Sequence, residues 1–540
     1  MQRHRHGLSA NPSLLTIIAH ARSGALDHAW GLLRDAGLDR INDDPAVLSV
    51  VGRLLKDKAL RAHGPARQQL FVEAASAYAR AAEIGGTTYP LINAATLSLL
   101  AKQNERAQSL ARLIMQQAQS AGDDADTPYY RAATRAEALL LLGQADQAKA
   151  ALAEAMLSAP QAYEDHASTL RQFALIIDEL GGDKTWLDSY RPPRCLHYAG
   201  HMATGAVPGE TGRQIRAALK EEKIGFGYGA LAAGADILIA EALLEEGAEL
   251  HLLLPAAPAR FREASVARSG GDWLERYDDI LKSANTIRAV GDGSVPSSPL
   301  ALQLAAEVAM GCAVMQSNVL MTEAVQLVIL ERNASAQPQT GSSEWACAAW
   351  GKTGRRQKVL VTPRIGAGAE TYRVSESGEP RLLRAMLRIE WSGANTSLLS
   401  REIIPRLTDI FAGEPKPSVR PRWTDDALLT GFDTPAQAAR IASSAIAALA
   451  GVADLRVAGH YGLAQQVEDP FGGAPLLIGS VVTLPAQITL STPPGAVHLT
   501  EDFAAALNAG PPMMRPSVEY VGELSGADEG ETIRLFALAQ

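Results

Sequence analysis

The stretch Arg191-Pro-Pro-Arg-Cys-Leu-His-Tyr-Ala-Gly-His-Met202 marks the point at which the pattern of the sequence changes. Its two prolines end a long helical region, because proline lacks the backbone N–H group that a helix needs and restricts the residue before it to extended conformations. The run Cys195–Gly200 then predicts a short buried strand that ends at a glycine. Ligands bind to open parallel sheets outside the carboxyl ends of such strands. The stretch therefore separates a helical part of the chain from an α/β part.

The residues before this stretch predict helices throughout. They are rich in Ala, Leu, Gln, Glu and Arg, with apolar residues three and four positions apart. Asn93–Ala107 and Ala133–Ala148 are alike, since each has small residues, a Leu cluster, a polar turn and a second helix that begins near an Ala. This is the helix-turn-helix pattern of tetratricopeptide repeats, although the spacing is longer than that of a strict repeat. The clearest helical segments are 67–84, 91–120, 129–154 and 163–180.

The residues after it alternate between strands and helices, which predicts a Rossmann-like α/β unit with a parallel sheet. Residues 333–380 are rich in Gly, Ser, Thr, Ala and Gln and predict a linker, partly structured at 358–362, whose basic cluster Lys352–Lys358 is solvated. The last third alternates again and predicts an α+β fold. We expect a flexible N-terminus at 1–14, helical repeats at 15–190, the Rossmann-like domain at 191–332, the linker at 333–380 and the α+β domain at 381–540.

The composition limits the classes of function. The chain has 540 residues and a net charge of −9, which argues against a general nucleic-acid binder because such proteins need a basic surface. Its three cysteines form no C-x-x-C pair, so neither a disulfide framework nor a thiolate metal site is expected. The start lacks a signal-peptide core, and the longest apolar runs, such as Ala230–Leu244, carry charged residues and are expected to be too short to cross a bilayer. We expect a cytoplasmic protein that binds neither nucleic acid nor membranes.

Two glycine-containing segments of the α/β part are candidates for a phosphate site. Gly200-His201-Met202 follows the first strand, and Gly227–Ala242 carries glycines and small residues that open a helix. Backbone N–H groups at such loops and at a helix N-terminus favour an anion. Neither segment is a Walker A loop or a G-x-G-x-x-G motif, and the alternative is that the glycines only permit close packing of helix and sheet. His197 and His201 are poorly spaced for joint metal ligation, so we expect one to be packed and the other to lie in the loop.

These residues also carry resemblances to known families. Tyr89–Thr96 and Tyr129–Ala138 resemble the repeat region of the TRAF-binding family over about residues 15–185, which implies protein contacts or intramolecular control. Residues 194–331 resemble the SLOG superfamily of Rossmann-like domains, related to DprA and the LOG phosphoribohydrolases. That resemblance implies a site for a nucleotide or nucleotide-derived ligand, with the expected ligand-binding residues Gly200, His201, Met202, Gly229, Ala230, Gly234, Asp236 and Glu241.

The hydrolase motif P-G-G-x-G-T-x-x-E of the LOG enzymes does not occur in the chain. Glu241 is the candidate general acid or base, but on a helix of Ala and Leu it equally fits a surface carboxylate. The α/β part is therefore interpreted as a sensor rather than a hydrolase.

The last third resembles a class III nucleotidyl cyclase domain. The resemblance lies in Thr424–Arg440, Gly479–Ile488 and Thr492–Phe503, and it implies a ferredoxin-like fold and head-to-tail pairing as a homodimer. Cyclisation needs two carboxylates that hold Mg²⁺ or Mn²⁺, and Glu390 and Asp425 stand at those positions.

At the other positions that match the catalytic motif of the cyclases, this chain has residues that cannot perform the same roles. Thr483 stands at the position of the transition-state Asn, Gln487 at that of the Arg, and Leu476 at that of the base-reading Asp. Without the guanidinium that grips phosphate, the domain is expected to be an inactive cyclase.

Three functional readings follow. The leading one is a cytoplasmic signalling protein that senses a nucleotide-type ligand and relays it through the helical repeats, which contact a protein partner, and through an inactive cyclase domain. The second is an enzyme, either a nucleotide N-glycoside hydrolase using Glu241 or a divergent cyclase using Glu390 and Asp425. The third is a scaffold that binds no small molecule.

Overall fold

The computed structural model describes residues 12–22, 25–120, 127–202, 209–290, 298–331, 338–362, 380–413, 415–424, 426–473, 475–511, 517–526 and 532–539. The chain forms two compact units. The first comprises residues 1–192 with 319–321, and the second comprises 193–318 with 322–540.

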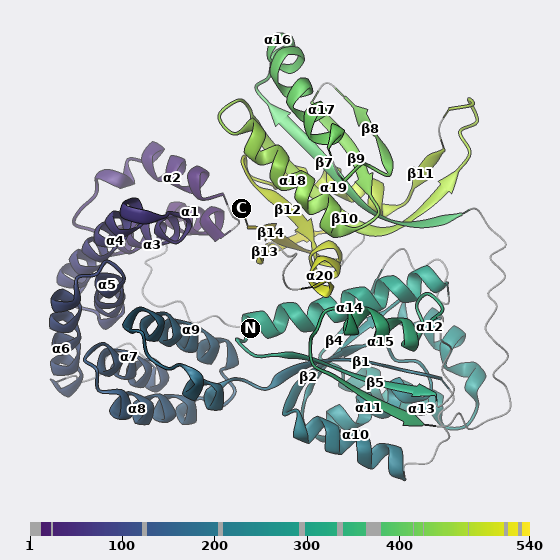
Figure 1. Cartoon of the computed structure of the whole chain (residues 1–540), viewed down its shortest axis with the longest axis horizontal. Helices are drawn as coiled ribbons and strands as arrows, with labels where there is room; N and C mark the ends of the chain where they lie inside the picture. Colours follow the sequence, from purple (N-terminus) through teal and green to yellow (C-terminus); the bar gives the residue numbers. More distant parts are fainter. Residues whose placement is uncertain are drawn as a thin grey trace. The chain divides into compact units, whose positions relative to one another are not determined.

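The described part of the first unit is helical, as the sequence predicts. Consecutive helices pack side by side along the unit, and small residues allow their close approach (Figure 1). A Cβ atom on Gly52 would lie only 2.7 Å from the ring of Tyr78 on the next helix. The first helix begins at Pro12 and buries Leu14, so residues 12–14 do not belong to the flexible N-terminus that was expected at 1–14. Residues 1–11 lie outside the described part.

The elements of this unit are α1 (Pro12–Arg22), α2 (Leu26–Asp35), η1 (Leu38–Arg40), α3 (Pro45–Arg61), α4 (Gly64–Gly85), α5 (Thr88–Leu100), α6 (Asn104–Ser120), α7 (Pro128–Leu141), α8 (Ala145–Ser158), α9 (Tyr163–Leu180) and η2 (Thr185–Tyr190).

The second unit contains a parallel sheet of six strands in the order β4-β3-β2-β1-β5-β6. Its strands are β1 (Arg194–Gly200), β2 (Ile224–Gly229), β3 (Glu249–Leu254), β4 (Thr286–Ala289), β5 (Ala324–Glu331) and β6 (Gln357–Thr362). Its helical elements are α10 (Glu210–Glu221), α11 (Ala235–Glu245), α12 (Pro258–Ser265), η3 (Ala267–Ser269), α13 (Trp273–Ser283), α14 (Pro299–Val319) and α15 (Ser343–Gly351).

Two expectations about this sheet are corrected. Gly227 and Gly229 do not open a helix but lie in β2, and α11 begins only at Ala235. Residues 343–351 and 357–362 are not linker, because they form α15 and the edge strand β6. The expected structured part at 358–362 corresponds to β6, whereas the small and polar composition of the segment hid α15.

The same unit contains a mixed sheet in the order β13-β14-β12-β10-β7-β9-β8, with β11 paired to β10. Only β10 and β12 are parallel among its pairs in the described residues. Its strands are β7 (Arg381–Ser392), β8 (Val419–Trp423), β9 (Ala427–Phe432), β10 (Asp454–Val467), β11 (Leu476–Ile478), β12 (Val497–Thr500), β13 (Val518–Ser525) and β14 (Thr532–Leu538). Its helical elements are α16 (Thr396–Leu398), η4 (Leu399–Ile403), α17 (Ile404–Ala412), α18 (Pro435–Leu449), α19 (Ser480–Thr489) and α20 (Glu501–Ala509).

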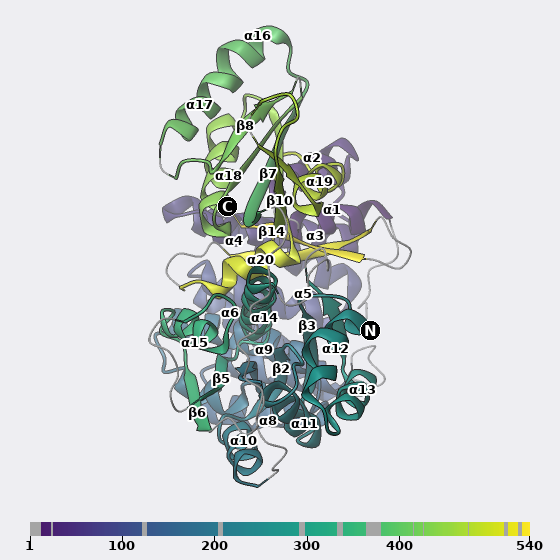
Figure 2. The ribbon, with the colours of Figure 1, turned by 90° about the vertical axis from the view of Figure 1, so that its right-hand side faces the viewer.

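Helix α20 joins the two sheets of this unit (Figures 1 and 2). At its N-terminus, Asp502 forms a short ion pair with Arg288 of β4, and Glu501 lies 3.5 Å from the Nε atom of the same arginine. At its C-terminus, Arg355 donates hydrogen bonds to the carbonyl oxygens of residues 508, 509 and 510 at 2.8–3.2 Å. Carboxylates at a helix N-terminus and a cation at its C-terminus both complement the helix dipole.

Helix α14 packs directly against α20. A Cβ atom on Gly311 would lie 1.8 Å from the carbonyl oxygen of Ala505, so only glycine fits at this contact. Among the described residues, α14 is the one helix long and apolar enough to span a membrane by length and composition. Within that apolar stretch 61% is buried inside the protein, as in the core helix of a globular fold.

We expect Gly311→Ala to destabilise the second unit by about 1–3 kcal/mol, because the added methyl group overpacks the contact with α20. Gly212→Ala on α10 is the matched control, since its Cβ atom would have no neighbour nearer than Arg216 Nη1 at 3.7 Å. The control should stabilise the unit by about 0.5–1 kcal/mol through helix propensity. Urea unfolding of wild type and both variants measures whether each substitution lowers or raises the free energy of unfolding. A Gly311→Ala variant that is more stable than the wild type would contradict the close packing of α14 and α20.

Candidate ligand site at the carboxyl end of β1

Strand β1 is the topological switch point of the parallel sheet. It pairs with β2 on one side and with β5 on the other, although three strands, β2, β3 and β4, lie between β1 and β5 along the chain. At such a position the connections leave the sheet in opposite directions and open a crevice outside the carboxyl end of the strand. Gly200, His201 and Met202 lie at this end, as the sequence predicts for a parallel sheet.

Gly200 is required by packing. A Cβ atom at this position would lie 2.2 Å from the Cβ atom of Ala235, the first residue of α11. The glycine therefore brings the end of β1 against the start of α11. This is the packing role that the sequence left open as the alternative to a phosphate contact.

Asp236 is a buried carboxylate that holds this corner together. One of its oxygens accepts a hydrogen bond from the N–H group of Gly200 at 3.0 Å, and the other accepts from Ala232 at 3.2 Å. Burial raises the pKa of Asp236 to about 7, and the two N–H donors only partly oppose this shift. Asp236 therefore ties β1 to the segment between β2 and α11.

His201 is fixed by three further hydrogen bonds. Its N–H group donates to Ile329 of β5 at 3.2 Å, and its Nε2 and Nδ1 atoms lie 2.9 Å from Thr362 Oγ1 and 3.0 Å from the Met202 carbonyl oxygen. Met202 forms an isolated antiparallel bridge with Gly234. Gly234 has a φ angle of +113°, a backbone conformation that residues other than glycine rarely adopt. Gly200, His201, Met202, Gly234 and Asp236 thus form one hydrogen-bonded corner.

Several backbone N–H groups that the sequence offered for an anion have acceptors within the protein. Besides the two donors to Asp236, Ala233 donates to the Ser265 carbonyl oxygen and Ala235 to that of His201. The chain segments 203–208, 291–297, 332–337 and 363–379, which follow β1, β4, β5 and β6, lie outside the described residues. An anion at the described corner therefore competes with the carboxylate of Asp236.

The other predicted ligand residues lie apart from this hydrogen-bonded corner. Glu241 forms a bidentate ion pair with Arg276 of α13 at 2.6 and 2.7 Å, and Arg276 stacks on Trp273. Gly229 ends β2, where a Cβ atom would lie 2.6 Å from the ring of Tyr198, and Ala230 packs at the edge of the apolar core. Glu241 therefore joins two helices, and its carboxylate has a partner.

The sequence did not predict a network of hydrogen-bonded polar side chains on β1, β5 and β6. His197 is buried and lies 3.0 Å from Gln326 Nε2, and Gln357 donates to Gln326 at 2.6 Å. Burial lowers the pKa of His197 to about 3, so it stays neutral. Gln326 and Gln357 also bind carbonyl oxygens of α15 and so anchor that helix to the sheet. The signal in the sequence was the glutamine in the otherwise apolar strand Ala324–Glu331.

The positions expected to bind metal lie on the mixed sheet. Glu390 Oε2 lies 3.2 Å from Arg388 Nε, and Glu390 Oε1 lies 3.9 Å from Arg456 Nη1. Asp425 lies outside the described residues, and its neighbour Asp426 lies 3.6 Å from Arg388. Within the described part of the chain, no group of three His, Cys, Asp or Glu side chains is arranged to hold a metal ion.

The remaining cyclase-like positions carry no cation. Thr483 and Gln487 are exposed on α19, and the Thr483 hydroxyl donates to the Ser480 carbonyl oxygen at 3.4 Å. Leu476 begins β11 and pairs with Val467.

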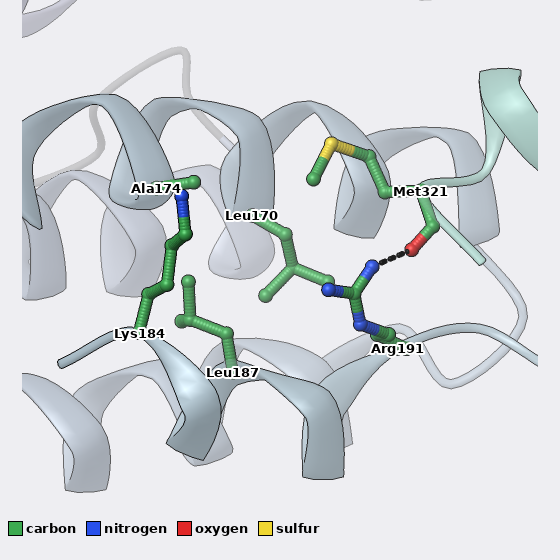
Figure 3. A pocket seen from close by; sticks show the side chains of 6 residues that line it. All are labelled: Leu170, Ala174, Lys184, Leu187, Arg191 and Met321. Carbon is green, nitrogen blue, oxygen red and sulfur yellow. Dashed lines mark hydrogen bonds between the residues drawn. The ribbon is translucent and has the colours of Figure 1, made fainter. Parts of the chain in front are cut away.

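One cavity lies in the first unit and was not predicted. Its volume is about 130 Å³, and Figure 3 shows the six residues that line it, which are Leu170, Ala174, Lys184, Leu187, Arg191 and Met321. Its two cations already have partners, because Lys184 binds Asp178 at 2.8 Å and Arg191 binds Asp188 at 2.7 Å. The cavity is smaller than the roughly 300 Å³ of ordinary small-molecule sites.

Comparison with known proteins gives a partial match. The family described as Tetratricopeptide Repeats-Sensor matches residues 7–98, which shows a region like tetratricopeptide repeats in the first unit. No curated protein matches the chain.

Among solved structures, the adenylyl cyclase CyaB from P. aeruginosa is similar at 9% identity over 30% of this chain and 96% of that chain, with a TM-score of 0.26. The guanylate cyclase domain of RhGC from Catenaria anguillulae, in complex with GTP, is similar at 12% identity over 30% and 98%, with a TM-score of 0.25.

We expect Asp236→Asn to destabilise the protein by about 1–3 kcal/mol, because an amide has one oxygen and cannot accept from both Gly200 and Ala232. The cost should depend on pH. The pKa of Asp236 is about 7 in the folded protein and about 3.9 in an unfolded chain. The folded state thus binds the proton more tightly, and the stability that Asp236 contributes falls as the pH rises from about 4 to about 7.

Urea unfolding of wild type and Asp236→Asn at pH 5 and pH 8 measures this effect. The stability advantage of the wild type should be smaller at pH 8. Asp409→Asn, at an exposed position on α17, is the control and should show no such change. Equal differences at both pH values would show that Asp236 does not titrate as its burial implies.

Proposed function

We propose that this chain is a regulatory protein that binds a nucleotide or nucleotide-derived ligand at the carboxyl end of β1. The observation that carries the proposal is the place of Gly200, His201 and Met202 at the switch point between β2 and β5. The region like tetratricopeptide repeats indicates a regulatory or protein-interaction role, since such repeats present extended surfaces to partners. In this proposal the repeats contact a protein partner, and the SLOG-like sheet supplies the signal.

Binding without catalysis fits the contacts of the candidate acid. A general acid or base has to reach the ligand with a carboxyl group that is free to exchange a proton. Both oxygens of Glu241 are held by Arg276 instead. This favours a sensor over an N-glycoside hydrolase.

The corner at Gly200 also bears on how a ligand is oriented. Asp236 already accepts the N–H groups of Gly200 and Ala232, so a phosphate placed there would have to replace it as their acceptor and would meet its negative charge wherever Asp236 is ionised. Like charges at contact distance repel. We therefore propose that the ligand presents its sugar or base, and not its phosphate, to Gly200 and Gly234.

A thermal-shift screen of nucleosides, nucleotides and dinucleotides tests the site. We expect at least one compound to raise the melting temperature, and we expect Met202→Glu to reduce that shift, because it places a charged side chain beside Gly234, where the sugar or base is proposed to bind. Ser283→Glu is the control, because it adds the same charge on α13, just before the amino end of β4. Gly200→Val is unsuitable, since its side chain would collide with Ala235.

The other possible outcomes of the screen would each support a different hypothesis. No shift with any compound would support the scaffold, and release of a free base would support the hydrolase. If Met202→Glu and Ser283→Glu reduced the ligand-induced rise in melting temperature equally, the ligand would bind away from the end of β1.

We also propose that the mixed sheet is a cyclase-like fold without cyclase activity. Gln487 and Thr483 offer no cation for the charge that develops on a transferred phosphoryl group, and Leu476 offers no polar group for the base. Removing one such electrostatic donor typically lowers turnover about 10²–10³-fold. Pairing with a second copy through this fold stays a prediction.

Incubation of the full chain with ATP or GTP and Mn²⁺ should give no cyclic nucleotide above the level without protein, as measured by chromatography and mass spectrometry. An active class III cyclase domain assayed in parallel controls for the conditions. Product formation that Glu390→Gln abolishes would contradict the proposal.

A further inference from the structure

An arginine lies beside Glu390, the one carboxylate of the expected metal-binding pair that the structure describes. Residues two positions apart in a strand point to the same face of a sheet, so Arg388 and Glu390 share one face of β7. Arg456 of β10 stands directly opposite Glu390 on one side, and Ala427 of β9 stands opposite on the other. Asp426 immediately precedes Ala427, so it reaches the same corner of the sheet.

The guanidinium group of Arg388 bridges the two acidic side chains of this corner. Its Nε atom lies 3.2 Å from Glu390 Oε2, and its Nη2 atom lies 3.6 Å from Asp426 Oδ2. Arg388 and Glu390 are 20% and 17% exposed, so both charges are largely removed from water, where an unpaired charge is costly. Each therefore depends on the other as its counter-ion.

A divalent metal ion does not fit this set of residues. Mg²⁺ and Mn²⁺ take several oxygen ligands whose negative charge offsets their own. Among the described residues, Arg388 and Arg456 offset the carboxylates of Glu390 and Asp426, so Glu390 already has cationic partners. Asp425 lies outside the described residues. An arginine side chain stays protonated in proteins, so its charge cannot be removed to admit a metal.

We propose that Arg388 is a built-in cation that bridges Glu390 and Asp426, beside the position where a metal ion was expected. The mixed sheet then keeps the charge balance of a metal site without binding metal. The inference takes from the proposed cyclase likeness only the choice of corner. It does not depend on the ligand proposed for β1, so either proposal can fail alone.

Binding of Mn²⁺ measured by electron paramagnetic resonance on the full chain tests the proposal. The wild type should leave Mn²⁺ free, whereas Arg388→Met should gain a bound fraction that the further change Glu390→Gln removes. Arg384→Met is the matched control, because Arg384 lies on the same strand but pairs with Asp433 at 3.1 Å. This control should bind no more Mn²⁺ than the wild type.

Two results would overturn the proposal. One is Mn²⁺ binding by the wild type that Glu390→Gln abolishes, a measurement that does not need Arg388→Met to fold. The other is a folded Arg388→Met, judged by circular dichroism, that binds no more Mn²⁺ than Arg384→Met.

Discussion

The second unit depends on the contacts that Arg288 makes outside its own sheet. This arginine is partly buried at the carboxyl end of β4, and within the described residues its carboxylate partners are Glu501 and Asp502 of α20. Desolvation lowers the pKa of Arg288, but these carboxylates outweigh it and hold the pKa above its ordinary value. Arg355 fixes the other end of α20, and the Gly311 contact fixes its middle. Because parallel strands end at one edge, Arg288 and Gly200 lie on the same edge of the sheet. Strands β2 and β3 lie between them, and β4 contacts the mixed sheet through α20.

The carboxylates that were singled out from the sequence and that the structure describes share a physical property, which is that the protein supplies their partners. Asp236 accepts two backbone N–H groups, Glu241 binds Arg276, and Glu390 binds Arg388. Catalysis needs groups that are preorganised toward the reacting atoms and that interact with those atoms more strongly in the transition state than in the ground state. Carboxylates that are already paired lose those pairs before they can act on a substrate. This pairing is the reason that binding rather than chemistry is proposed for the end of β1.

The sequence predicted the helical repeats, most of the strands with apolar runs and the glycine at the end of β1, because these depend on local periodicity and proline placement, but it assigned α15 to a linker. It missed β2, because Gly225, Gly227 and Gly229 disfavour a strand by propensity. The structure gives the reason for those glycines, since Pro193, Leu243 and Tyr198 pack where their side chains would lie. It also missed the partners Thr362, Arg276 and Arg388. Their roles depend on which strands and helices become neighbours, and no local pattern carries that information.

The internal counter-charges also bear on how a regulatory protein of this kind responds to a signal. A ligand shifts an equilibrium only through the difference in its affinity for two states. At the end of β1, a ligand group that competes with Asp236 for the N–H groups of Gly200 and Ala232 would loosen the tie between β1 and α11. A ligand that leaves those bonds intact would instead stabilise the corner as it stands. Since the pKa of Asp236 is about 7, its protonation weakens the acceptor at neutral pH and brings the two arrangements closer in free energy. The same carboxylate that positions Gly200 can therefore set how readily the corner yields to a ligand.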